Sequence, residues 1–258
     1  MTLGERKSRT FAPTFHVMTT TSILILFLFS LGAAFVQRVS GFGFGIFIMT
    51  ILPYLMPSYG ESTALSGLLA SVTSLIIVVR MWRHIHWKRL LPVLATFWIV
   101  SYFSVQCISL VGDGALKRVL GAVLILVSIY LYFFSKKVQV KATLPVQITA
   151  GTLSGVMGGF FGMQGPPVVP YFLASEPTKE GYVAIAQSYF LLGNLGMTFY
   201  RAGSGFLTPA VGQAWCYGVV AVLIGTYLGT LVFNRISALT LRKIVYLYMA
   251  VSGVIALL

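Results

Sequence analysis

The chain has very few acidic residues for its length. Five of its 258 residues are Asp or Glu, and charged residues of both signs make up 9% of the total. A soluble domain carries about 25% charged residues, whereas this chain is 57% hydrophobic with a mean hydropathy of +0.90. These proportions exclude an ordinary soluble domain. They predict an all-α integral membrane protein whose apolar runs cross the bilayer as helices.

The positions of the acids narrow the class of substrate. None lies in the middle of an apolar run, and Glu61 and Glu180 stand at the starts of two such runs, where a carboxylate caps a helix. A proton relay or a cation site inside the membrane needs buried carboxylates. Their scarcity opposes cation transport and favours a neutral or anionic substrate. Coupling to sodium through backbone carbonyls stays open.

Histidine is also scarce, with three residues outside the apolar runs, His16, His84 and His86. Ser154, in a small-residue segment, therefore has no buried base to activate it as a nucleophile. An intramembrane serine protease is a remote alternative, and we expect no enzymatic activity.

The two cysteines, Cys107 and Cys216, each lie within an apolar run. This predicts small core side chains, with neither a disulfide framework nor a metal site. No cofactor is suggested.

The net charge of +13 comes mostly from Lys and Arg in short loops between apolar runs. This is the distribution of cytoplasmic loops in membrane proteins, so we expect no nucleic-acid partner. The clusters Arg80–Arg89 and Lys136–Lys141, together with the basic tail, predict a multi-pass membrane protein with a cytoplasmic N-terminus. Arg235, Arg242 and Lys243 oppose this orientation, because they flank a loop that it places outside.

The apolar runs predict one transmembrane domain over residues 1–258, with two homologous halves at about 20–135 and 145–258. Each half has four predicted spans and one shorter apolar piece, too short to cross a hydrocarbon core of about 30 Å as a helix. We interpret both short pieces as broken, re-entrant segments. The eight spans are about 20–38, 62–80, 89–111, 116–135, 145–161, 182–201, 209–233 and 241–258, and the short pieces are about 44–56 and 166–174.

The two halves share a Gly-broken segment that ends in Pro and Tyr. Gly41, Gly45, Pro53 and Tyr54 match Gly158, Gly162, Pro170 and Tyr171 at a spacing of 117 positions. Further matches occur at 121 positions: Ser66 with Gln187, Thr73 with Asn194, and Arg80 with Arg201. The loop charges favour a parallel repeat with eight spans. If the short pieces crossed fully, each half would have five spans and the repeat would be inverted.

Paired Gly/Pro-interrupted segments in two halves of a membrane protein indicate a transport site. A helix that begins inside the membrane offers free N–H groups and a partial positive charge to an anion. The segment Gly162–Pro167 has this form: its glycines permit close approach to the backbone, Gln164 adds an amide donor, and Pro166 suits a helix start. The alternative is that these small residues only permit close helix packing.

Polar residues within the spans extend the predicted site. Gln187 and Asn194 are seven positions apart and share one helix face; interhelical hydrogen bonding is the alternative role for such residues. Arg38, beside Gln37, is a charge near the membrane interior, where it either contacts an anion or extends to an interface. The complete set of predicted binding residues is Gln37, Arg38, Gly41, Gly43, Gly45, Ser66, Gly162, Gln164, Gly165, Pro166, Gln187, Ser188 and Asn194.

The second-half pattern resembles the TauE/SafE family of sulfite exporter-like permeases. Its glycines run from Gly151 to Gly165 and are followed by two prolines, Gln187 and Asn194. The resemblance covers about 25–258, although the first half has alternating Gly and Phe where the family has more continuous glycines. It implies an inner-membrane permease for a small sulfur-containing anion such as sulfite or a sulfonate, without a cofactor. A channel-like or sodium-coupled carrier of another small metabolite is the alternative, and self-association is left open.

Overall fold

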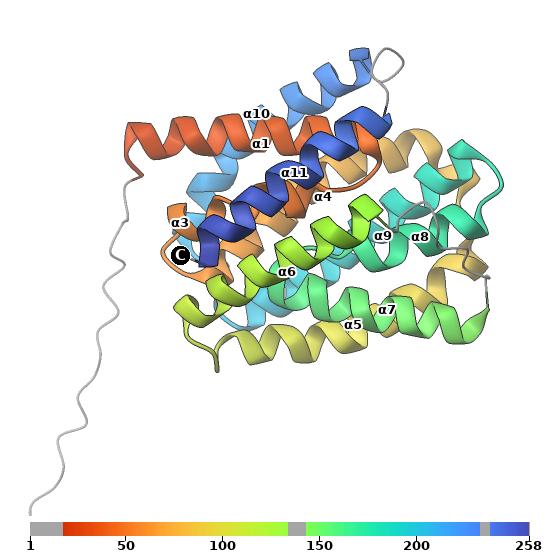
Figure 1. Ribbon diagram of the computed structural model, residues 1–258, viewed down its shortest axis with the longest axis horizontal. Coiled ribbons are helices and arrows are strands. Elements are labelled where there is room, and N and C mark those ends of the chain that lie inside the picture. Colours follow the sequence, from red (N-terminus) through yellow and green to blue (C-terminus); the bar gives the residue numbers. More distant parts are fainter. Residues whose placement is uncertain (1–17, 134–142, 233–237, 258) are drawn as a thin grey trace, which may run out of the picture.

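The computed structural model describes residues 18–133, 143–232 and 238–257, and in these ranges the protein is all-helical, as predicted. Figure 1 shows a bundle with α1 along one edge, α5 and α7 along the other, and α6 and α11 crossing between them. The longer helices are α1 (Thr20–Ser40), α4 (Tyr59–Met81), α5 (Trp87–Ile108), α6 (Asp113–Phe133), α7 (Leu144–Phe161), α9 (Lys179–Gly203), α10 (Pro209–Val232) and α11 (Ala238–Leu257). The short elements are α2 (Phe44–Ile48), α3 (Leu52–Leu55), the 3-10 turn η1 (Trp82–His84) and α8 (Gly165–Ser175).

Four of the helical stretches are long and apolar enough to cross a membrane by length and composition within the described part of the chain. They are Thr20–Ser40, Tyr59–His84, Trp87–Ile108 and Pro209–Val232. Each coincides with a predicted span. The four other predicted spans are helical, but their membrane crossing stays a prediction.

Local sequence signals set the ends of these helices. Ser58 accepts a hydrogen bond from the Glu61 N–H at 3.2 Å, and Thr178 accepts one from the Gly181 N–H at 3.1 Å, so α4 and α9 begin with the same type of cap. At the other end, α1 and α7 stop at Gly41 (φ 85°) and Gly162 (φ 67°), in the left-handed conformation that glycine adopts most readily. Gly41 and Gly162 are 121 positions apart. The structural equivalent of Gly41 is therefore Gly162, and the predicted pairing of Gly41 with Gly158, at a spacing of 117, is wrong.

Side-chain contacts give the relative directions of the helices, beginning with α1, α4 and α10. Along α1 and α10, Ser30 lies beside Gly218, and Arg38 lies beside Gly229, so these two helices are parallel. The same Gly218 lies beside Leu69 of α4. Further along α1 and α4, Gln37 reaches Ser74. Hence α1, α4 and α10 all run in one direction.

A second group of helices, α5, α7 and α9, runs in the opposite direction. Gly151 and Gly159 of α7 lie beside Thr96 and Ser104 of α5 respectively. Along α5 and α9, Phe97 contacts Tyr189 and Tyr102 contacts Tyr200. In contrast, α4 and α9 are antiparallel, because Ser74 bonds Gln187 whereas Gly60 lies against Phe206.

These directions contradict two parts of the predicted topology. A parallel repeat requires the equivalent helices α4 and α9 to be parallel, but they are antiparallel. Because α1 and α4 run the same way, the chain between them must return from one end of the protein to the other through α2 and α3. Since α7 and α9 also run the same way, the chain between them must likewise return from one end of the protein to the other through α8. The short segments therefore do not turn back to the side from which they came.

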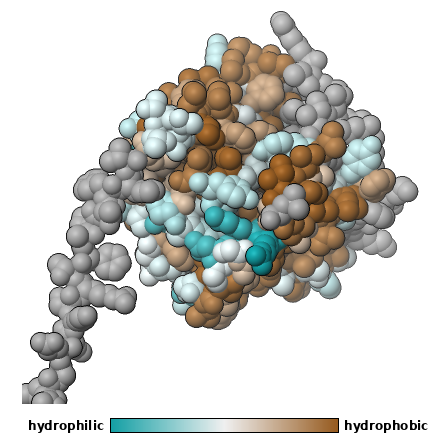
Figure 2. Space-filling view, turned by 60° about the vertical axis from the view of Figure 1, so that its left-hand side comes forward, coloured by the Kyte–Doolittle hydropathy of each residue, from teal (hydrophilic) through white to brown (hydrophobic). Residues whose placement is uncertain are grey.

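The outer surface is largely apolar. Figure 2 shows mostly hydrophobic side chains around the bundle, with a smaller hydrophilic area on the end turned toward the viewer. Large exposed apolar residues occur on most of the long helices, for example Leu24, Ile99, Leu126 and Phe199. In a soluble protein such a surface would drive aggregation, whereas lipid tails solvate it, in agreement with a membrane location.

Candidate functional site

The two broken segments meet in the middle of the protein. A Cβ atom added at Gly45 would lie 2.0 Å from the carbonyl oxygen of Gly162 and 3.1 Å from its carbonyl carbon. No side chain fits there, so glycine at position 45 is required for this approach. The start of α2 thus packs directly on the turn between α7 and α8.

A pocket of about 30 Å³ opens beside this contact. It brings together seven of the thirteen predicted binding residues. The N-terminal ends of α2 and α8 both border it, as do two side chains with amide groups from α1 and α9. Its lining is Gln37, Gly43, Phe44, Gly45, Ile46, Ala70, Gly162, Met163, Gln164, Gly165, Phe190 and Asn194.

Gln164 is the polar centre of the second-half wall. Its Nε2 donates to Asn194 Oδ1 at 3.0 Å and to the Phe190 carbonyl at 3.2 Å. Its backbone carbonyl accepts from Ser154 Oγ, which in turn accepts from the Tyr189 hydroxyl at 2.7 Å. Gln164 Oε1 is buried without a hydrogen-bond partner in the described part of the chain. The side chain is therefore held in place while one of its polar atoms stays unsatisfied.

The start of α8 offers fewer backbone donors than the sequence suggested. Its first three residues are Gly165, Pro166 and Pro167, and proline has no N–H group. Only Gly165 can donate from this turn. Nε2 of the Gln164 side chain donates to Asn194 and to the Phe190 carbonyl, so this side of the pocket keeps Gly165 as a backbone donor and Gln164 Oε1 as an unsatisfied acceptor.

A second amide cluster lies at the first-half wall. Gln37 Nε2 donates to Ser74 Oγ and to Gln187 Oε1, both at 3.0 Å, and Ser74 Oγ donates to the same Gln187 oxygen at 3.0 Å. Gln187 Nε2 donates to the Gly41 carbonyl at 2.9 Å. This network ties α1, α4 and α9 together, and of its members Gln37 borders the pocket.

The other predicted binding residues do not line the pocket. Ser66 Oγ would be 3.6 Å from a Cβ at Gly162, and Gly41 and Gln187 belong to the amide cluster. Pro166 is buried in the first turn of α8. Ser188 is buried on α9 but does not line the pocket.

Arg38 points away from the pocket. Its Nε donates to Thr230 Oγ1 of α10 at 2.8 Å, and its Cβ lies 2.8 Å from the position of a Cβ at Gly229. The side chain is half-buried between α1 and α10. Arg38 is therefore not among the residues that line this pocket, and its contact with an anion stays a prediction.

Arg201 was missed as a site residue. It is fully buried, and its Nη2 donates to the carbonyls of Gly158 at 3.0 Å and Gly159 at 3.4 Å. In the sequence, Arg201 stands out only as the match of Arg80, at the end of the predicted span 182–201. The signal available was its place after a long run of apolar and small residues, with no acid nearby in the chain.

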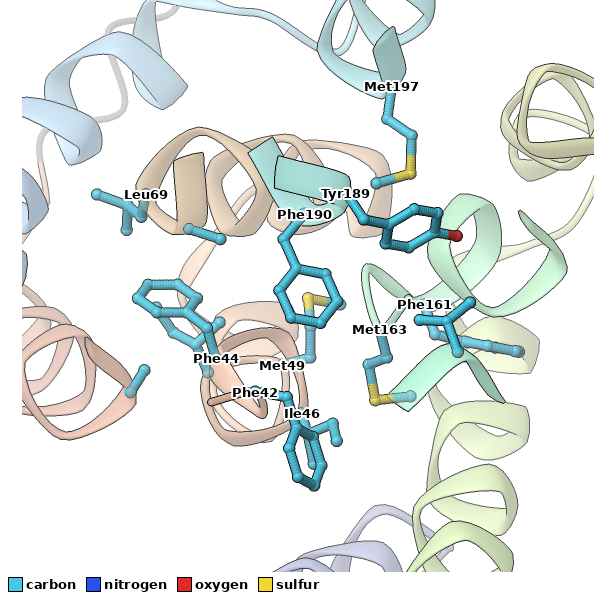
Figure 3. Packing of buried hydrophobic residues seen from close by; sticks show 14 of the residues in the cluster. Phe42, Phe44, Ile46, Met49, Leu69, Phe161, Met163, Tyr189, Phe190 and Met197 are labelled. Atoms are coloured by element: carbon cyan, nitrogen blue, oxygen red, sulfur yellow. The ribbon is translucent and has the colours of Figure 1, made fainter. Parts of the chain in front are cut away.

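The apolar wall of the pocket comes from both halves. Figure 3 shows Phe190 of α9 directed toward Phe44 and Met49 of the first broken segment, with Met163 on the other side. Phe44, Met163 and Phe190 are all at most 5% exposed. Such walls exclude water and strengthen the hydrogen bonds of the few polar groups that they surround.

Basic residues gather at one end of the bundle. Arg38 and Arg80 lie near the ends of α1 and α4, close enough for their positive charges to repel each other. The turn η1 adds Arg83, and the start of α5 adds Lys88 and Arg89. Arg89 Nη1 and His86 Nδ1 contact the buried carboxylate of Glu176 at 3.1 and 2.7 Å, so the end of α8 belongs to the same end of the protein.

The chain was compared with known proteins. A family model described as "Sulfite exporter TauE/SafE" matches residues 26–255. The "Probable sulfite/organosulfonate exporter TauE" of Cupriavidus necator is 25% identical over 223 residues, which are 84% of this chain and 86% of that protein. The "Uncharacterized inner membrane transporter YedA" of Escherichia coli K12 is 28% identical over 128 residues, 49% of this chain and 42% of that protein. No solved structure matches significantly.

Proposed function

The chain belongs to the TauE/SafE family of sulfite exporters, and from that membership we propose that it carries a small sulfur-containing oxyanion or organosulfonate across the inner membrane. It is a membrane transporter, as its family and the printed names of its relatives indicate. The proposed route passes through the pocket beside Gly45 and Gly162. We propose no catalytic role.

The chemistry of the pocket lining carries this proposal. Of the described residues that line it, none is acidic, and the polar side chains are the amides Gln37, Gln164 and Asn194. The starts of α2 and α8 add backbone N–H groups and a partial positive charge. Nε2 of Gln37 and of Gln164 already donates to protein acceptors, so the donors left for a ligand are these backbone groups and the Asn194 amide. Without a full charge, they hold a sulfonate group weakly enough for it to leave again, as transport requires.

The helix directions support an inverted repeat with five crossings in each half. The crossings would be α1, α2 with α3, α4, α5 and α6 in the first half, and α7 to α11 in the second. The broken segments then cross as short helices with irregular backbone between and before them, which is tolerated where protein buries it or a cavity is present.

The basic residues orient this topology. Arg38, Arg80, Arg83 and Arg89 lie at one end of the bundle, and the first turns of α11 bring Arg242 and Lys243 to the same end. By the positive-inside rule this end is cytoplasmic. The first residue of α1 is then at the external face, opposite to the orientation expected from the basic tail, which lies outside the described residues. In this topology Arg242 and Lys243 lie on the same side of the membrane as the other basic residues, so they no longer oppose the orientation.

Labelling of single cysteines tests the orientation. In a variant with Cys107 and Cys216 replaced by Ser, Pro177→Cys should be protected from an impermeant maleimide added outside, and Gly203→Cys should react. Both positions are exposed, and a Cβ at Gly203 meets no atom within 4 Å. The eight-span model predicts the reverse for both, so reversed labelling would overturn the inverted topology.

Flux into proteoliposomes tests the substrate class. We expect the purified protein to move sulfite or methanesulfonate, with little movement of rubidium or of neutral glycerol. Movement of a cation, with no response to any sulfur oxyanion or sulfonate, would overturn the assignment.

A further inference from the structure

Arg201 carries a buried charge whose hydrogen bonds are incomplete. Its side chain has 0% exposure, and Nε and Nη1 have no hydrogen-bond partner among the described residues. The ion pairs in the described part of the chain both involve Glu176, so no carboxylate neutralises Arg201. A buried charge without a partner is strongly destabilising. The carbonyls of Gly158 and Gly159, near the end of α7, accept hydrogen bonds from Nη2. Capping of α7 therefore explains the position of one of the three guanidinium nitrogens of Arg201.

Polar atoms of α9, two of them without a hydrogen-bond partner among the described residues, converge on one glycine of α4. From the position of a Cβ at Gly67, Arg201 Nη1 is 3.1 Å away, Asn194 Oδ1 is 3.7 Å away and Thr198 Oγ1 is 3.9 Å away. Asn194, Thr198 and Arg201 follow each other at helical spacing on one face of α9. Asn194 also borders the pocket. The polar wall of the pocket therefore continues along α9 as far as Arg201.

Two hydroxyl groups in this region have no hydrogen-bond partner in the described part of the chain. They are Thr198 Oγ1 and the Tyr59 hydroxyl, both buried. Tyr59 is fully buried at the start of α4, and the next residue, Gly60, lies against Phe206 just after the end of α9. Buried polar groups are hydrogen-bonded in the great majority of cases, so several unsatisfied donors around one cation indicate an absent acceptor with several oxygens.

We propose that Arg201 supplies the positive charge that binds the transported anion, at a second position on its path beyond Asn194, with Thr198 and Tyr59 as hydroxyl donors. This inference rests on the proposed function and adds the residue that selects a negative charge. A guanidinium group presents its N–H groups as a planar fork that matches the oxygens of a sulfonate or sulfite. As the transporter opens to each side in turn, the anion contacts the pocket and Arg201 successively.

Binding of methanesulfonate and of its neutral analogue dimethyl sulfone tests the role of the charge. The two ligands have a methyl group and sulfur-bound oxygens in common and differ in charge. For Arg201→Gln we expect the methanesulfonate Kd, measured by calorimetry on purified protein, to rise by about ten- to a hundredfold, as for loss of one charge-assisted hydrogen bond. Binding of dimethyl sulfone should not change. Arg201→Lys keeps the charge and should lose less affinity than Arg201→Gln.

Arg80→Gln is the matched control, because Arg80 occupies the equivalent place in α4 and is exposed. It removes the same charge and should leave both affinities within about twofold. Equal losses in Arg80→Gln and Arg201→Gln would overturn the proposal, since the effect would then be one of net charge. If Arg201→Gln does not fold, Thr198→Val decides: a rise in the methanesulfonate Kd of at least about threefold supports the site, and an unchanged Kd overturns it.

The behaviour of the unmodified protein separates the two proposals. If it binds acetate or phosphate but no sulfur oxyanion, and Arg201→Gln abolishes that binding, the substrate class is wrong and the role of Arg201 stands. If it binds methanesulfonate and Arg201→Gln binds it equally well, the role of Arg201 is wrong and the proposed function stands. If it binds no anion, both are overturned.

Discussion

The two broken segments occupy equivalent places, yet they are built differently. In the first half the chain forms two short helices, α2 with five residues and α3 with four. In the second half it forms one helix, α8, with eleven residues and two prolines in its first turn. The first turn of α2 contains Phe44, Gly45 and Ile46, each of which has an N–H group. The first turn of α8 has one such group, at Gly165.

This difference shows how the two halves divide the tasks of the pocket. The first segment offers its backbone, and Gly45 keeps that backbone in contact with the Gly162 carbonyl. The second segment offers a side chain, Gln164, which is held by Asn194 and by the Phe190 carbonyl. A duplicated sequence can thus reach an asymmetric site, because the two prolines of α8 lack the backbone donors that the first turn of α2 keeps.

The largest effect should come from adding a methyl group at Gly45. Gly45→Ala places a Cβ about where the Gly162 oxygen lies, so the two segments must separate and methanesulfonate binding should fall by at least about a hundredfold. Gly165→Ala is the matched control, because its Cβ would lie 3.5 Å from Phe42, an ordinary contact. That variant should bind within about twofold of the unmodified protein. Similar losses in both variants would show that the close contact is not required.

The next effect concerns the side-chain donor of the second half. Gln164→Leu removes the bonds to Asn194 and Phe190 and leaves buried acceptors unsatisfied, at a cost of about 1–3 kcal/mol, so the Kd should rise by about tenfold or more. Gln147→Leu is the control: Gln147 is also buried and donates to the Tyr171 hydroxyl at 2.7 Å, but it does not line the pocket. It should lower thermal stability and leave the Kd within about twofold. A normal Kd for Gln164→Leu would assign that residue to packing.

A smaller effect is expected at the amide cluster of the first half. Ser74→Ala removes one bond to Gln187 and one acceptor of Gln37, while the bond between the two glutamines remains. One neutral hydrogen bond contributes about 0.5–1.5 kcal/mol, so we expect the Kd to rise by about two- to tenfold. A loss as large as that of Gln164→Leu would mean that both walls bind the ligand through side chains.

The smallest effect should follow from Arg38→Gln. Because Arg38 donates to Thr230 of α10 and does not line the pocket, the methanesulfonate Kd should change by less than about twofold. Measured beside Arg201→Gln, this variant compares a charge near the basic end of the bundle with one buried inside it. A tenfold rise for Arg38→Gln would place the anion nearer to α10 than we propose.

The sequence alone predicts the helices and the neighbourhood of the site. Helix formation and membrane preference depend on apolar runs, caps and loop charges, all of which are local in the chain, and the long helices occur where these signals place them. The glycines near 41–45 and 162–165 mark the pocket because interrupted backbone inside a membrane needs a cavity or a protein cover. Gln37, Gln164 and Asn194 could be named for the same reason, as amides close to those interruptions.

Tertiary structure decided the directions of the helices and the partners of the two arginines. A segment of about fifteen residues can either turn back or cross, and its sequence does not distinguish these outcomes. Only contacts between distant helices, such as Ser74 with Gln187, show that α4 and α9 are antiparallel. In the same way, Arg38 and Arg201 both stand near helix ends in the chain. Packing directs one to Thr230 and encloses the other beside Gly67, because burial depends on which helices lie against a side chain and not on its place in the sequence.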